Sequence, residues 1–391
     1  TTTLAVTNAG GPGIVTTGNG IPVIEALHGG TTAANAFTLA GEARGGAFDY
    51  RLFRGGLGGT LPDDWFLRSQ FTVPGVPSIP GEPPGVPGQP PLTPGTPESP
   101  VLPSDPPPAV LPPGQYPIIG PELASYSVVQ PVARQMGTAL LGTLHERLGD
   151  TLSRAGDGTD PSWGWGRLFG QQIDNRYQTY TDARARGSLG GFQVGIDLWR
   201  DSLIPAPRDA SGFYVAYATS HVDVKGLVTN AAATGYALDR TGTLQLEAYA
   251  GGAYWTHYGP SGWYLDYVVQ GTHYSGHAST PFARLPVTGA GFLTSLEGGY
   301  PIALPLGPRF VLEPQAQLLW QHVGMNAAHD GLGEVALGGT SGLTGRLGLR
   351  GQWTIQRANG DVWQPYGRVN LWRDWGGQAT TTYAGSDQVP L

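Results

Sequence analysis

The strongest restriction on the fold is a series of segments after Trp163 in which apolar and polar residues alternate. In the segment GFQVGIDLW, one face is apolar and the other is polar or glycine: Phe192, Val194, Ile196 and Leu198 against Gln193, Gly195 and Asp197. Strict alternation predicts a β-strand with two different faces. The polar faces contain mainly Gln, Gly and Arg, instead of the Lys and Glu of a strand that faces water. We therefore predict strands of a transmembrane β-barrel, with the apolar face toward lipid.

Nine such strands are predicted, at about residues 163–172, 187–200, 211–224, 244–258, 262–276, 286–300, 309–322, 341–353 and 362–375. A bacterial single-chain barrel has an even number of strands, because both chain ends return to the same side. Nine strands cannot close such a barrel, so we expect further strands beyond Leu391. The chain opens with TTTLAVTNAG, without an initiator Met, so we also expect that it is a piece of a longer protein.

The composition excludes several classes of protein. Gly and Pro account for 62 and 35 of 391 residues and charged residues for only 13%, which is unlike an ordinary helical enzyme. No stretch reaches about 18 consecutive apolar residues, so no transmembrane helix is expected. The net charge of −7 argues against a nucleic-acid partner. The absence of Cys excludes disulfides and thiolate metal sites.

The prolines divide the chain. Residues 72–119 hold 18 of the 35 prolines and are predicted to be a Pro/Gly-rich linker. Residues 1–71 contain short β-segments interrupted by Gly and are predicted to form a small β module. In this module we expect an aromatic core, next to Arg51, that consists of Tyr50, Phe53, Trp65 and Phe66. Residues 120–150 and 151–391 are the predicted helical segment and the barrel.

One helix is predicted from Pro131 to Leu148, because Pro suits the first helical position and Gly149 can end the helix. At 1.5 Å per residue it spans about 27 Å, close to the roughly 25 Å apolar band of a barrel. Its polar residues are Arg134, Gln135, His145, Glu146 and Arg147. A charge on the lipid face costs about 2–4 kcal/mol, so we expect these groups to face inward-pointing residues of the barrel. The lumen residues expected there are Glu297, Glu313, Gln315, Gln317, Arg346 and Arg350.

Several of these segments together resemble the C-terminal part of a monomeric (type Va) autotransporter. AFDYRLFRGG followed by PDDWFLRS resembles the end of a pertactin-like β-helical passenger. ARQMGTALLGTLHERLG resembles the helix inside the pore, and WGRLFG the first barrel strand. SLEGGYPIAL and LEPQAQLLWQ resemble the middle of the barrel.

The resemblance implies an all-β fold, with a twelve-stranded barrel in the full protein, about nine strands of it present here, and a pore-spanning helix. It further implies a bacterial outer-membrane location, with the N-terminal part at the cell surface. The barrel would deliver and anchor its own passenger, and residues 1–71 would be a β-helix-like, autochaperone-like cap. Outer-membrane lipid, the barrel assembly machinery and periplasmic chaperones would be its partners.

No catalytic group, metal site or cofactor is expected. GxSxG, HExxH and GxxxxGK[ST] are absent, and residues 131–148 contain no Asn for self-cleavage by cyclisation. His257, His273 and His277 lie on strand segments without further metal ligands. Two alternatives remain open: a general diffusion porin, which has 16 to 18 strands, and a surface adhesin or enzyme whose active part lies before Thr1.

Overall fold

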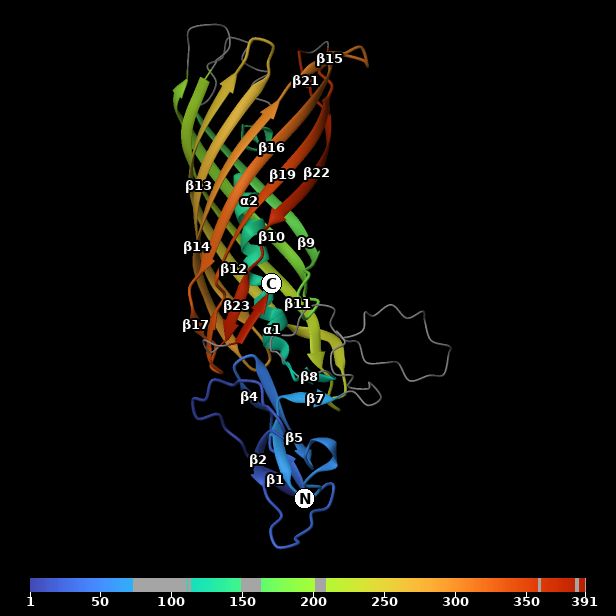
Figure 1. Ribbon diagram of the computed structural model, residues 1–391. Coiled ribbons are helices and arrows are strands. Elements are labelled where there is room, and N and C mark those ends of the chain that lie inside the picture. Colours follow the sequence, from blue (N-terminus) through green and yellow to red (C-terminus); the bar gives the residue numbers. More distant parts are fainter. Residues whose placement is uncertain are drawn as a thin grey trace, which may run out of the picture.

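A computed structural model describes residues 1–72, 111, 114–148, 163–200, 209–357, 360–383 and 387–390. Most of the predicted linker, residues 73–110 and 112–113, lies outside the described residues, as do residues 149–162. Figure 1 shows an elongated molecule in which a small N-terminal module stands at one end of a curled sheet and a helical segment lies inside that sheet.

The N-terminal module is built from short strands and one 3-10 helix. Its elements are β1 (Thr2–Leu4), β2 (Ile21–Ile24), β3 (Phe37–Leu39), β4 (Ala43–Gly45), β5 (Phe48–Arg54), η1 (Leu57–Gly59), β6 (Trp65–Arg68) and β7 (Gln70–Thr72). Strands β1 and β3 pair in parallel, and the order β2-β6-β5-β4 forms an antiparallel sheet. Within this small sheet, Trp65, Phe66 and Phe48 are buried and form the apolar core of the module.

The large sheet contains nine long antiparallel strands, as predicted, with a short strand attached to one of them. They are β9 (Gly164–Arg176), β10 (Arg184–Arg200), β11 (Asp209–Thr229), β12 (Tyr236–Tyr258), β13 (Tyr264–Ser279), β14 (Arg284–Gly299), β16 (Phe310–Met325), β19 (Gly339–Gln352) and β22 (Tyr366–Gly376), with β15 (Ile302–Leu304) on β16. Neighbouring strands in this order pair along the sheet, so β9 and β22 are its two edges in the described part of the chain.

The remaining short strands lie in the connections. They are β17 (Ala328–His329), β18 (Glu334–Ala336), β20 (Ile355–Gln356), β21 (Val362–Trp363), β23 (Thr380–Tyr383) and β24 (Asp387–Pro390). The order β17-β18-β23-β24 forms a small sheet at the end of the barrel next to the module. Tyr383 of this sheet stacks on Tyr126 of the helical segment, with ring centroids 6.3 Å apart.

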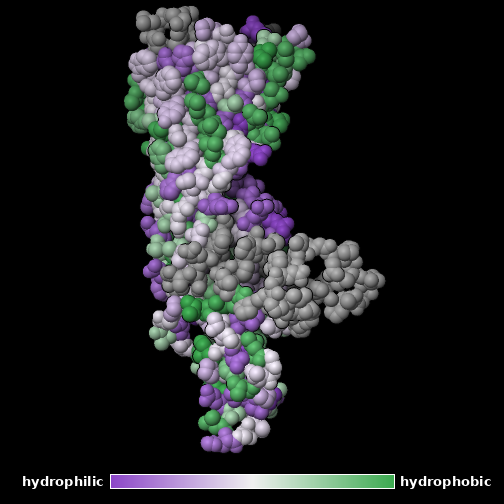
Figure 2. Space-filling view, in the orientation of Figure 1, coloured by the Kyte–Doolittle hydropathy of each residue, from purple (hydrophilic) through white to green (hydrophobic). Residues whose placement is uncertain are grey.

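The predicted alternation of faces is confirmed. On β10, Phe192, Val194 and Ile196 are 41–47% exposed on the outer face, whereas Gln193 and Asp197 are 0% and 4% exposed on the inner face. On the half of the barrel remote from the module, Figure 2 shows hydrophobic stripes on the outer surface. This half therefore has the lipid-facing band of a membrane barrel.

The strands extend beyond this band on the module side. On β11 the outer face changes from Phe213 and Val215 to His221, Asp223 and Lys225, which are all exposed. Twelve residues of β11 follow Tyr217, the last aromatic residue on the outer face before this change, which corresponds to roughly 30 Å at the usual rise and tilt. The barrel thus projects past the membrane toward the module.

A charge in the lipid-facing band should destabilise the barrel. Leu347 is 64% exposed in the middle of the outer face of β19, so Leu347→Arg should cost about 2–4 kcal/mol. His221→Arg, on the outer face beyond the band, should cost almost nothing. The temperature at which the folded band in an electrophoresis gel converts to the unfolded one measures both. If both variants lose the same stability, Leu347 does not lie in the lipid-facing band.

The helical prediction was wrong in its start and its continuity. The segment starts ten residues earlier than predicted and is divided into α1 (Pro121–Ser127), α2 (Val129–Leu141) and α3 (Leu144–Leu148). Pro131 is in the first turn of α2, where a missing N–H removes no intrahelical hydrogen bond. Pro121 is the residue that starts the first helix.

The predicted end of the linker was also wrong. Strand β8 (Gln115–Pro117) pairs with β7 of the module, and Ile118 and Ile119 are 0–1% exposed. Ile118 donates its N–H to Ser69 O at 2.8 Å, and Ile119 donates its N–H to Thr229 Oγ1 at 2.8 Å. Residues 115–119 therefore connect the module to the barrel.

Candidate functional site

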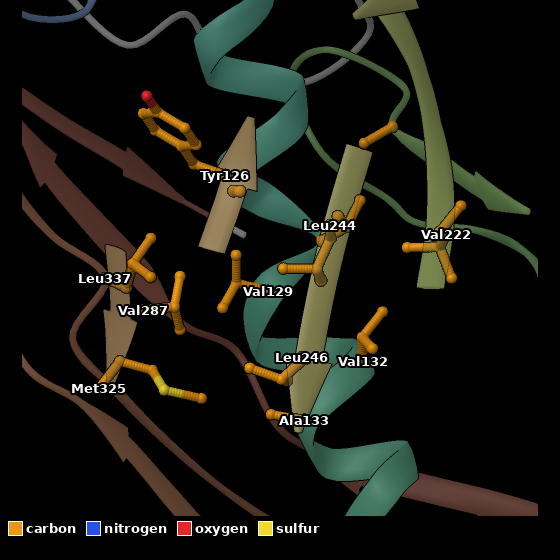
Figure 3. Packing of buried hydrophobic residues seen from close by; sticks show 14 of the residues in the cluster. Tyr126, Val129, Val132, Ala133, Val222, Leu244, Leu246, Val287, Met325 and Leu337 are labelled. Carbon is orange, nitrogen blue, oxygen red and sulfur yellow. The ribbon is translucent and has the colours of Figure 1, made fainter. Parts of the chain in front are cut away.

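The lumen of the barrel is occupied by the helical segment, and the start of α2 packs in an apolar cluster in the half next to the module. Figure 3 shows Val129, Val132 and Ala133 of α2 close to Leu244 and Leu246 of β12. Further members of this cluster shown in Figure 3 are Tyr126, Val222, Val287, Met325 and Leu337. Van der Waals packing therefore holds this part of the helix, without the charged contacts expected from the sequence.

Small residues make room for α2 in the middle of the lumen. The inner faces of β11 and β12 carry Ala216, Ala218, Ala248 and Ala250, all 0–7% exposed. Gly137 of α2 lies against the wall, and its carbonyl accepts a hydrogen bond from Gln270 Nε2 at 3.1 Å. The small residues on both sides thus let α2 pack directly against the wall at this level.

The helix breaks between α2 and α3 at Gly142, which has a φ of +64° that favours glycine. The guanidinium of Arg167 on β9 donates to the free carbonyls of Ala139 and Leu140 at 2.6 and 3.1 Å. Arg167 also donates to Gln193 Oε1 at 2.7 Å. One barrel arginine therefore satisfies the last carbonyls of α2, which have no intrahelical partner.

Four consecutive residues of α3 contact different strands. The Leu144 N–H donates to Glu297 Oε2 at 3.2 Å, and His145 Nε2 lies 2.7 Å from Glu313 Oε1. Arg147 Nη2 contacts both carboxylate oxygens of Asp266 at 2.6 and 2.7 Å, with both side chains almost fully buried. Successive helical residues point about 100° apart, so even a helix as short as α3 can contact strands on different sides of the lumen.

Glu146 joins the two edge strands of the large sheet. Its carboxylate pairs with Arg167 of β9 at 3.5 Å and with Arg368 of β22. It also accepts the N–H of Thr143 at 3.0 Å, while Thr143 Oγ1 accepts the N–H of Glu146 at 3.3 Å. This reciprocal pair is a capping box at the start of α3.

A polar network in the wall supports α3. Arg346 is buried and lies 2.9 Å from Glu297 Oε1. It also donates to Gln315 and Gln317, each at 2.9 Å. The predicted lumen residues Glu297, Glu313, Gln315, Gln317 and Arg346 therefore lie together beside α3.

The other predicted residues have different contacts. Gln135 accepts a hydrogen bond from Asn175 Nδ2 at 2.9 Å. The Arg134 guanidinium lies against the backbone of Gly342 and Gly377. Arg350 donates to Gln352 at 2.5 Å.

Sequence reasoning missed Asp266 and Arg167, which are central to the site. Both lie on the polar phase of a strand, and that is the only signal that could have found them. It marks every inward residue equally, so it does not say which ones meet α3.

In the module, Trp65 and Phe66 are 4% exposed, whereas Tyr50 and Phe53 are partly buried. Trp65 Nε1 donates to Thr32 Oγ1 at 3.0 Å, and Phe37 meets the Trp65 ring edge-on at 5.4 Å. Tyr50 donates its hydroxyl to Ile14 O at 2.6 Å. Arg51 lies 3.5 Å from Glu42.

Two family descriptions match the chain. "Autotransporter beta-domain" matches residues 164–390, which is more than half of the chain. The chain belongs to the autotransporter family. "Autochaperone Domain Type 1" matches residues 1–52 of this autotransporter, which agrees with the predicted cap. The β-domain of the autotransporter lies in the outer membrane, delivers the passenger, and leaves it exposed at the cell surface.

Two curated relatives are also named autotransporters. The chain is 26% identical over 407 residues to the Adhesin BmaC autotransporter of Brucella suis biovar 1 (strain 1330), covering 96% of this chain and 10% of that protein. It is 31% identical over 236 residues to the BrkA autotransporter of Bordetella pertussis (strain Tohama I), covering 58% of this chain and 21% of that protein. The autotransporter chain described here thus spans a small part of the length of either relative.

Among solved structures, the β-domain of the Bordetella autotransporter BrkA is similar, with 21% identity and a TM-score of 0.38 over 56% of this chain and 84% of that one. Among the described residues of the autotransporter, no helix has the length and hydropathy needed to cross a membrane. The same described residues contain no group of three or more His, Cys, Asp or Glu that could hold a metal ion.

Proposed function

We propose that, once residues 164–390 have delivered the passenger, α1 to α3 remain in the lumen and anchor it. The observation that carries the proposal is the continuous path of residues 114–148 from β8, which pairs with β7 of the module, through α1 and α2 to the charged contacts of α3. Because apolar packing holds this segment at one end and buried ion pairs hold it at the other, its removal from the lumen would break both sets of contacts.

Residues 1–71 are proposed to start the folding of the passenger outside the cell. The match to an autochaperone description supports this role, as does the compact core around Trp65. A module that folds at the cell surface would prevent the exported chain from sliding back through the pore.

Trp65→Ala tests this role. Removing the buried indole should cost about 3–5 kcal/mol, which a module this small can hardly tolerate. Surface display of the passenger should fall several-fold, measured by antibody binding to intact cells, while the barrel remains heat-modifiable. Trp363→Ala, at an exposed position of β21 remote from the module, is the control. Equal display of the Trp65 variant and the parent would contradict the folding role.

Insertion is proposed to use the barrel assembly machinery and periplasmic chaperones. The exposed apolar outer band supports this partnership, because a barrel precursor that carries it must be shielded from water in the periplasm. Depletion of the assembly machinery should leave the unfolded form of the protein in the periplasm, where protease digests it. A fully heat-modifiable barrel after depletion would argue against it.

A surface-adhesive role is proposed for the whole protein, because one relative is named an adhesin. It would belong to the segment before Thr1, with the barrel as the anchor. Cells that display the full-length protein should adhere to host cells more than cells that display the same protein without the segment before Thr1. Equal adhesion would place the activity elsewhere.

A further inference from the structure

The junction between the module and the barrel contains a buried cluster of charges that no function described above uses. Arg44 of β4 is its centre, with a side chain that is only 6% exposed. Its Nη1 atom lies 3.1 Å from Asp49 Oδ1 of the module and 3.1 Å from Glu122 Oε2 of α1. Its guanidinium also lies 3.6 Å from the centre of the Phe282 ring in the β13–β14 connection.

The cluster joins three parts of the molecule. Glu122 accepts a hydrogen bond from Thr280 Oγ1 at 2.7 Å, which ties α1 to the same barrel connection. The Asp49 N–H donates to Ile118 O at 3.0 Å, so the connecting segment lies beside it. Arg44 therefore contacts the module, the start of the lumen segment and the barrel mouth at once, at the place where Figure 1 shows α1 entering the barrel.

We propose that the barrel mouth is a docking surface for the folded module, held by Arg44, and that docking takes up protons, so that the module is released as the pH rises. The inference goes beyond the delivery and anchoring of the passenger and concerns the state of the module after secretion. The docking contact follows from the geometry of the junction, and its pH dependence follows from the buried acids that meet there.

The charge balance of the cluster gives the direction. Arg44 faces the carboxyls of Glu42, Asp49 and Glu122. Arg51 on β5 lies next to Glu42. On the barrel side, the carboxyl of Asp330 and the phenol of Tyr383 lie near Glu122. Two arginines thus meet a larger number of acids. Burial raises the pKa of Asp49 to about 7, against the lowering effect of Arg44 and with a further raise from Glu122. Burial likewise raises the pKa of Glu122.

The sign follows from these shifts. A separated module would expose Asp49 to water and return its pKa toward 3.8. Docking is then most favourable below about pH 4, weakens as the pH rises toward 7, and is constant above that value. Through Asp49 alone, the docking constant can fall by at most about a thousandfold over this interval, because each pKa unit corresponds to a factor of ten.

The test measures the position of the module directly. The chain contains no Cys, so nitroxide labels can be placed at Leu27→Cys on the module and Ala232→Cys in the β11–β12 connection, which are both exposed. Electron spin resonance then gives the distance distribution in the full chain in detergent micelles. We expect a narrow distribution at pH 5 and a broad one at pH 8.5.

Three variants decide the mechanism. Asp49→Asn should keep the distribution narrow at both pH values, because no proton is needed. Arg44→Met should broaden it at both, and Arg54→Met, whose ion pair with Asp63 lies outside the cluster, should behave like the parent. If Arg44→Met disturbs the module itself, Phe282→Ala tests the same contact from the barrel side and should also broaden the distribution.

A narrow distribution for the parent at both pH values would overturn the proposal, and so would an Asp49→Asn variant that still broadens at pH 8.5. An Arg44→Met variant that stays narrow would remove Arg44 from the docking contact. Passenger display is measured in the same strains. If the distance distribution of the parent does not respond to pH while passenger display is normal, this inference alone is refuted and the proposed function is left intact.

Discussion

Arg147→Met should be among the most destabilising single substitutions in the barrel. The Arg147 side chain is 1% exposed and its two contacts to Asp266 form a buried ion pair. Removing one partner leaves the other charge buried and uncompensated, which costs about 3–5 kcal/mol. The conversion temperature of the folded band and the unfolding midpoint in denaturant should therefore both fall clearly.

The matched control is Arg186→Met. Arg186 is on the outer face of β10, 83% exposed, and lies 3.8 Å from Asp174, so its pair should contribute little. The double variant Arg147→Met with Asp266→Leu should regain part of the lost stability, because two apolar side chains replace the pair without a stranded charge. Equal losses for Arg147→Met and Arg186→Met would contradict the importance of the α3 contacts.

Gly137→Val should displace the lumen helix and open the pore. A Cβ atom on Gly137 would lie 2.2 Å from Gln321 Nε2 and 3.0 Å from the Tyr274 hydroxyl. Overpacking at such a site typically costs about 1–3 kcal/mol, and the clash is relieved by a turn of the Gln321 side chain together with a shift of α2 away from Tyr274. Single-channel conductance in a planar bilayer should rise well above that of the parent.

Gly251→Val is the control for this substitution, because a Cβ atom at Gly251 on the outer face of β12 would have nothing within 4 Å. It should leave conductance and stability close to those of the parent. If the Gly137 variant conducts like the parent and loses no stability, α2 does not fill the lumen at this level.

Much of the barrel could be predicted from the sequence, because lipid imposes a simple rule on each strand. Every second side chain must be apolar and every backbone group must pair with a neighbouring strand, so Phe192 and Val194 show their orientation locally. The positions of the nine strands followed from this rule. The strand ends beyond the membrane did not, because His221 and Lys225 face water and carry no lipid signal.

The contacts of the lumen could not be predicted in the same way. Arg147 and Asp266 are 119 residues apart, and their meeting depends on the stagger of the strands around the barrel and on the break at Gly142. Alternation shows only that Asp266 faces inward. The axial level at which it faces the helix is a property of the whole curled sheet, which no local pattern contains.

The sequence by itself therefore determined the class of fold, the outward face of each strand and the presence of a helix between the linker and the barrel. Each of these depends on residues within a few positions of one another. Only the tertiary structure decided where that helix breaks, which side chains hold it, and that Arg44 of the module reaches Glu122 in the barrel mouth. Such pairs form between elements far apart in the chain, and their geometry follows from how the packed elements fit together.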